Sequence, residues 1–272
     1  FFDGVPTAET AEKVWDHLDF SRAVESMIMC TPAASLAGFR RGIREYGPDN
    51  ETAIIWESRL DSKGLLLTGN TTVIYLFMWI DTKKGPVVME TPPNVLAILD
   101  NFWFHYVTDI GNAGPDKGKG GKYIILPPDY EGDLEEGPFV KRSETYGNWL
   151  AVRGFPKGDD NAAVVKNIKD HLKVYPLAEA DNPKPVKFHD VSNKYINTLH
   201  AQDITFFHEV NEVVQEEPAA AWSTESLGML ASIGIEKGNR RVQRSEFKGS
   251  EVQRLKPRTP NREPGNCKKR RT

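Results

Sequence analysis

The sequence predicts an α+β protein that is mainly β, with helices at both ends of a central antiparallel β-sandwich. Two observations carry this prediction. Residues 7–46 and 192–234 place apolar side chains at helical spacing, whereas residues 51–155 contain six to eight short β-rich runs bounded by Gly, Asp or Asn. Few helical stretches separate those runs, which favours an antiparallel sandwich over a β-α-β array.

The N-terminal segment is expected to form three short helices. Thr7 suits an N-cap position, and residues 20–30 carry a second apolar face. Pro32 is expected to break or kink the chain, because proline lacks the amide hydrogen that a helix interior needs. Apolar residues at spacings of three and four in residues 36–43 predict the third helix.

The β region opens with the runs "AIIWES", "KGLLLTGN", "TVIYLFMWID" and "GPVVMET". The next run, "NVLAILD", is interpreted as a short apolar turn before the strand "FWFHYVTDI". On the third run, Tyr75, Phe77 and Trp79 share one strand face, and aliphatic residues occupy the other. If the aliphatic face packs inward, the aromatic row is free to stack on sugar rings or to meet a partner sheet.

Helical periodicity returns after the β region. Val165 and Ile168 lie on one face of residues 159–175, and a proline-rich connector follows. Residues 192–234 are expected to be helical again, with an apolar stripe from Ile196 to Val214.

The C-terminal segment is predicted to be disordered and basic. Residues 239–272 hold 12 Lys and Arg against 3 Asp and Glu, so this segment carries +9 and the rest of the chain −12. Such tails are typical of nucleic-acid or membrane binding. We interpret this one instead as a frame-shifted or truncated ending, which disfavours nucleic acid as a partner. The predicted organisation is a helical segment (1–48), a β-sandwich domain (49–190), a helical segment (191–238) and the tail (239–272).

Composition excludes several classes of protein. The longest apolar run, residues 73–80, is too short to cross a membrane, and the first ten residues lack the pattern of a signal peptide. The two cysteines do not predict a disulfide, since Cys30 lies in an apolar stretch and Cys267 in the polar tail. No cofactor is predicted.

The stretch "DIGNAGPDKGKGGKYIILPP" (109–128) resembles a phosphate-binding loop but fails its requirements. A P-loop needs Gly, four residues and Gly-Lys-Ser/Thr between a strand and a helix. Around Gly118 and Lys119, Ala113 stands in the first glycine position and Gly120 in the hydroxyl position. A strand-like run follows Lys122, so no helix dipole faces a phosphate.

Three interpretations of this loop remain open. It is a solvated connection across the mouth of the sandwich, an anion or sugar-acid clamp, or a metal site built on Asp109 and Asp116, although no metal site is predicted on balance. The clamp would combine glycine amides with polar side chains. Its candidate residues are Asp109, Asn112, Asp116, Lys117, Lys119 and Lys122.

Four residues outside the loop complete the candidate ligand site. Tyr75 and Trp79 belong to the aromatic row, and His105 lies in a strand where it could line a pocket. Arg153 is a charged residue within an apolar strand, which predicts a buried carboxylate or a ligand as its partner. Nucleophile motifs are absent from the sequence, and the catalytic residues are unknown.

Three long motifs resemble the domain of unknown function 1254 family: "GNTTVIYLFMWID", "GPVVMETPPNVLAILDNFWFHYVTDIGNAGPDKGKGGKYIILPPDY" and "YGNWLAVRGF". The likeness extends over residues 3–237. It implies an immunoglobulin-like sandwich with helical segments and an exported protein, periplasmic or secreted. It also implies a C-terminal partner domain, domain of unknown function 1214, which is expected to be missing because the likeness stops near "IGIEKG". No catalytic assignment transfers from the family.

Two functions are therefore expected to compete. The first is a binding or assembly module for a small anionic or polyhydroxylated ligand, which also associates with its own copies or with the missing domain. The second is a hydrolase whose active site needs that domain. A chain without its second domain is further expected to expose the apolar helical stripe from Ile196 to Val214 and to self-associate.

Overall fold

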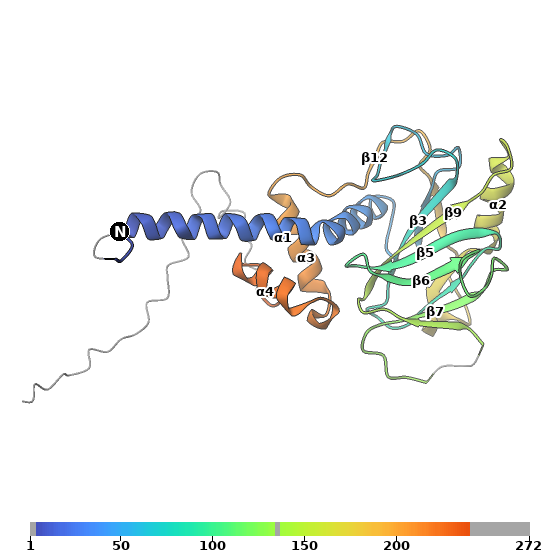
Figure 1. The fold of residues 1–272 in the computed structure, drawn as a ribbon. Coiled ribbons are helices and arrows are strands. Elements are labelled where there is room, and N and C mark those ends of the chain that lie inside the picture. The colour runs from blue at the N-terminus through green and yellow to red at the C-terminus, as the bar shows by residue number, and fades with distance from the viewer. Residues whose placement is uncertain (1–3, 134–136, 240–272) are drawn as a thin grey trace, which may run out of the picture.

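The computed structural model describes residues 4–133 and 137–239 and confirms an α+β protein with a helix at its N-terminus (Figure 1). The helices are α1 (Ala8–Arg44), α2 (Asn161–His171), α3 (Thr205–Glu216) and α4 (Thr224–Ser232). The strands are β1 (Thr52–Ile55), β2 (Gly64–Leu65), β3 (Ile74–Asp81), β4 (Val87–Glu90), β5 (Val95–Asn101), β6 (Tyr106–Gly111), β7 (Lys122–Leu126), β8 (Phe139–Arg142), β9 (Gly147–Gly154), β10 (Lys173–Pro176), β11 (Lys187–Asp190) and β12 (Ile196–Asn197).

The N-terminal segment is one helix of 37 residues, so the expectation of three short helices is wrong. The Thr7 side chain caps it by accepting a hydrogen bond from the amide of Thr10, as expected. Pro32 lies inside the helix and does not end it; Figure 1 shows α1 changing direction part-way along its length. Buried packing after Ser26 holds the helix together across the proline.

Two large sheets form most of the β region, and β2 belongs to a separate two-stranded sheet with β12. A six-stranded sheet has the order β11-β1-β3-β9-β5-β6, and a four-stranded sheet has the order β10-β4-β7-β8. Aliphatic side chains from both sheets share one hydrophobic core. The sandwich is not purely antiparallel as expected, because β1 pairs with β11 and β7 with β8 in parallel. In each of those pairs the later strand, β11 or β8, lies at the edge of its sheet.

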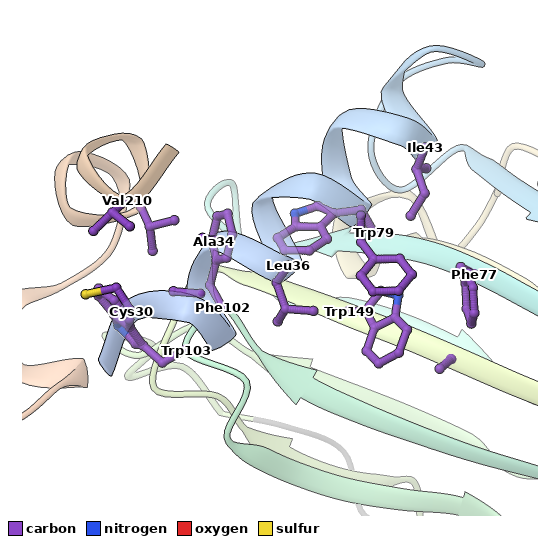
Figure 2. Packing of buried hydrophobic residues seen from close by; sticks show 14 of the residues in the cluster. Cys30, Ala34, Leu36, Ile43, Phe77, Trp79, Phe102, Trp103, Trp149 and Val210 are labelled. Carbon is purple, nitrogen blue, oxygen red and sulfur yellow. The ribbon is translucent and has the colours of Figure 1, made fainter. Parts of the chain in front are cut away.

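Both faces of β3 are buried. Its aliphatic row faces the core between the sheets, and its aromatic row packs against the helical layer. Phe39 of α1 meets Phe77 with ring centroids 5.3 Å apart, and it also contacts Trp149. Figure 2 shows Trp149 of the sheet beside Leu36 of α1. The molecule therefore has three layers: the helices α1, α3 and α4, the six-stranded sheet and the four-stranded sheet. Helix α2 packs against the core between the two sheets. The aromatic row is used by this internal packing and not by a partner sheet.

Two segments fold differently from expectation. The run "NVLAILD", expected to be a turn, forms the greater part of β5, because it pairs with β6 on one side and β9 on the other. The expected helix after residue 192 begins only at Thr205. Before it, Ile196 lies in β12, which pairs with β2.

The helices are fastened to the sheets by buried polar contacts. The Arg40 guanidinium donates hydrogen bonds to the carboxylates of Asp49 (3.0 Å) and Glu216 (2.5 Å). It also lies over the Trp79 ring. At the end of α3, the Glu217 carboxylate accepts the amides of Tyr146 (2.6 Å) and Gly147 (3.0 Å).

Several other expectations concern single features. Cys30 is fully buried, as predicted, and Cys267 and all of the expected tail after Asn239 lie outside the described residues. Within the described residues, no helix is both long and apolar enough to span a membrane.

Candidate functional site

The glycine-lysine loop between β6 and β7 carries the chain from one sheet to the other. Its centre is Asp116, which is buried and accepts three hydrogen bonds. One carboxylate oxygen takes the Gly111 amide (2.8 Å) and the Tyr123 hydroxyl (2.7 Å), and the other takes the Gly120 amide (3.2 Å). Strand β7 follows directly at Lys122, which confirms that no helix N-terminus faces this loop.

The glycine amides of this loop already have partners. Besides the two amides on Asp116, those of Gly114 and Gly118 donate to the Gly111 carbonyl, and that of Gly121 donates to the Thr91 hydroxyl. An anion clamp made of these amides would have to break internal hydrogen bonds. The structure therefore favours the interpretation of the loop as a connection across the sandwich.

The other candidate residues of the loop lie around Asp116. Asn112, Lys117, Lys119 and Lys122 are exposed, and Lys122 lies opposite Glu90 in the sheet. Within the described part of the chain, no group of three or more His, Cys, Asp or Glu could hold a metal ion, so Asp109 and Asp116 gain no metal partner there.

A second arrangement, which we call the carboxylate site, lies at the β5–β6 end of the six-stranded sheet. It consists of Asp100, Phe104, Tyr106 and Asp109. Asp100 ends the row formed with Leu96 and Ile98 on the helix-side face of β5, and Asp109 lies opposite Ile98 on β6. The two aspartates are thus near each other on the same face, although the β-bulge between Leu99 and Asp100 shifts the register between them.

The two carboxyl groups of this site have no hydrogen-bond donor or ion-pair partner among the described residues. Asp100 is the more unusual of the two, since it is only 6% exposed. Burial, and secondly the charge of Asp109, raise the pKa of Asp100 to about 7. A carboxyl with this pKa exchanges its proton near neutral pH.

Aromatic rings border the carboxyl pair. Phe104 is 39% exposed and meets Trp149 edge to face at 5.6 Å. Its backbone has φ 65°, a left-handed conformation that costs energy in a bulky residue and is often associated with function. Tyr106 lies opposite Asp100, is 63% exposed, and its hydroxyl accepts the Asp109 amide (3.0 Å).

Arg153 lies further along the same face. It is opposite Leu96 of β5, four residues from Asp100 and therefore about 13 Å away along the strand. The expectation of a buried carboxylate partner is not met, because the side chain is exposed and its guanidinium lies 5.7 Å from the centre of the Tyr75 ring. This leaves the cation available at the surface.

The remaining sequence candidates are dispersed. Tyr75 and Trp79 are buried under the helical layer, and His105 is exposed in the turn before β6. Sequence reasoning missed Asp100. The available signal was a charged residue next to a run of apolar residues. The same kind of signal drew attention to Arg153, which is a charged residue within an apolar strand.

A separate concavity lies away from the carboxylate site. A cleft of about 660 Å³ runs between the β3–β4 turn and β10. Its rim mixes cations, such as Lys83 and Lys84, with carboxylates, such as Asp49 and Glu51, that are already paired with basic side chains. It offers no convergent set of unpaired groups.

Comparison with known proteins agrees with this fold. Residues 51–176 match the model of the family described as Protein of unknown function (DUF1254). The match confirms the resemblance carried by the three sequence motifs.

The crystal structure of the VPA0106 protein from Vibrio parahaemolyticus is similar, with a TM-score of 0.58 and 19% identity over 84% of this chain. The chain spans 55% of the length of that protein. At this identity the likeness concerns the fold alone. No curated protein matched the chain.

Proposed function

We propose that the carboxylate site binds a polyhydroxylated, sugar-like ligand. The observation that carries this proposal is Asp100, a carboxyl that is more than nine-tenths buried and has no donor within the described residues. Its oxygens are not among the fully buried side-chain atoms that lack a partner, so they remain reachable from the surface. Ligand hydroxyl groups would supply the donors that Asp100 and Asp109 lack.

The surroundings suit such a ligand. Sugar rings present apolar C–H faces that pack on aromatic rings, and Phe104 and Tyr106 offer exposed rings beside the carboxyl pair. Arg153, about 13 Å away along the strand, would hold an acidic group at the far end of an elongated ligand. We therefore favour an acidic oligosaccharide of two or three units over an inorganic anion.

Two finer properties are proposed from the family resemblance. One is that the paired sheets are a variant of the immunoglobulin-like sandwich; the shared core between them supports it. The other is that the protein functions in the periplasm or outside the cell, where acidic and neutral oligosaccharides are accessible.

Ligand binding is tested by a thermal shift assay with neutral and uronic-acid oligosaccharides, followed by calorimetry on any hit. We expect Asp109→Asn and Tyr106→Ala to weaken binding at least tenfold, since each removes one element of the site. Tyr195→Ala is the matched control, because Tyr195 is also exposed but lies far from β6 in sequence and outside the site. Lys119→Ala separates the proposal from the loop clamp: if it abolishes binding and Tyr106→Ala does not, the carboxylate site is wrong.

A second function, hydrolysis of a glycosidic bond, is favoured by one specific observation. With a pKa of about 7, Asp100 can donate a proton to a leaving-group oxygen at neutral pH, while the Asp109 carboxylate removes a proton from the attacking water. Assays on esters, glycosides and phosphates distinguish this from binding alone. Glycoside turnover that falls as the pH rises through 7, and that Asp100→Asn abolishes, would support it. Turnover of esters or phosphates only would contradict it.

A further inference from the structure

The N-terminal half of α1 projects beyond the sheets and beyond α3 and α4. Figure 1 shows it extending away from the sheets and from α3 and α4. No residue in 8–25 is buried, and burial begins at Ser26. At 1.5 Å per residue this projecting part is about 27 Å long.

This half of the helix exposes a set of large apolar side chains. They include Trp15 (59%), Phe20 (71%) and Ile28 (70%). The full set is Val14, Trp15, Leu18, Phe20, Val24, Met27 and Ile28. Steps of 100° spread these side chains over about 240° of the helix circumference. A helix that is apolar over most of its circumference is normally buried, so this one lacks its partner.

The exposed area is of the size that an interface needs. The seven side chains expose about 700 Å², close to the 800 Å² that each partner contributes to a standard interface. A projecting helix of this length is also marginal in water without tertiary contacts. Packing against another surface would therefore stabilise the helix itself.

We propose that this half of α1 packs against the same segment of a second copy of the chain, forming a two-fold symmetric dimer. Such an interface is self-complementary, since the same surface serves on each side. Both basic residues of the segment are paired within the helix, Lys13 with Glu9 (2.8 Å) and Arg22 with Asp19 (3.6 Å). The five acidic and two basic residues of 8–25 leave a net negative charge, which disfavours an anionic membrane surface.

Sedimentation of the full chain, wild type and variants, tests the dimer. We expect the wild type to dimerise and the triple variant Trp15→Ser, Phe20→Ser, Ile28→Ser to raise the dimer dissociation constant at least 100-fold. Tyr195→Ser, which removes an equally exposed aromatic ring elsewhere, should leave the constant unchanged. Far-UV circular dichroism of the triple variant checks that the sheets and α3 remain folded.

A cross-link identifies the surface independently. Ser21 is exposed near the middle of the apolar set, so Ser21→Cys should form a disulfide between two copies under mild oxidation. Asp181→Cys, exposed on a distant connector, should not. A monomeric wild type overturns the proposal and leaves the helix for a different partner. A dimer that survives the triple variant, or that Ser21→Cys does not cross-link, overturns it as well.

Discussion

Asp100 is a largely buried carboxyl whose pKa is raised by burial. Its folded-state pKa of about 7 exceeds the ordinary value of 3.8. Between those two pH values Asp100 holds a proton in the folded protein that it has released in the unfolded chain. The contribution of Asp100 to stability is therefore highest below pH 4, falls as the pH rises toward 7, and stays at the lower level above that.

Replacing Asp100 by Asn should make stability less dependent on pH. We expect Asp100→Asn to be about 2 kcal/mol more stable than the wild type at pH 8 and no more stable at pH 4, since Asn cannot ionise. Urea unfolding at both pH values measures this. The exposed Asp181→Asn should show no such crossover. A constant difference between wild type and Asp100→Asn at the two pH values would refute the assignment of a buried, unpaired carboxyl.

At the scale of single elements, the loop between β6 and β7 depends on one side chain. Asp116 accepts two backbone amides and one hydroxyl, while the lysines around it point to solvent. We expect Asp116→Ala to lower the free energy of unfolding by about 3 kcal/mol, because three donors lose a buried acceptor. Lys119→Ala should change it by less than about 0.5 kcal/mol. Equal effects in chemical unfolding would show that the loop is held in another way.

Helix α1 depends on a glycine for its close approach to the chain before α3. A Cβ on Gly38 would lie 2.6 Å from the Thr198 carbonyl oxygen and 2.8 Å from that of Leu199. Gly38→Ala should therefore cost about 2 kcal/mol despite the better helix propensity of alanine. Gly228 of α4 has nothing within 4 Å of such a Cβ, so Gly228→Ala should gain about 0.5 kcal/mol. Thermal unfolding of the pair checks both signs; stabilisation by both would contradict the close contact.

At the scale of the whole molecule, helix α1 is buried along one half and exposed to solvent along the other. Its C-terminal half is buried between the six-stranded sheet and α3, and its N-terminal half is exposed. The proposed dimer links folding to association, so the transition temperature should rise with protein concentration. Scans from 1 to 100 μM would show this in the wild type. The triple α1 variant, which removes the interface, should unfold at a temperature independent of concentration.

The sequence alone determined the class of the protein. Period-two runs with turn residues between them predict strands, the 3.6-residue period predicts helices, and the motif spacing excludes a P-loop, because all three depend on neighbouring residues. Three long motifs were enough to indicate the family. Thr7 as the N-cap and Cys30 as a buried residue also follow from local context.

Tertiary structure decided what the local patterns could not. Pro32 stays inside a continuous helix because packing on both sides outweighs the lost hydrogen bond, and "NVLAILD" becomes a strand because β6 and β9 flank it. Burial and pairing depend on residues distant in sequence. For that reason only the folded chain could show that Asp116 is an internal acceptor, that Trp79 lies under a helix, and that Asp100 is a buried carboxyl without a donor.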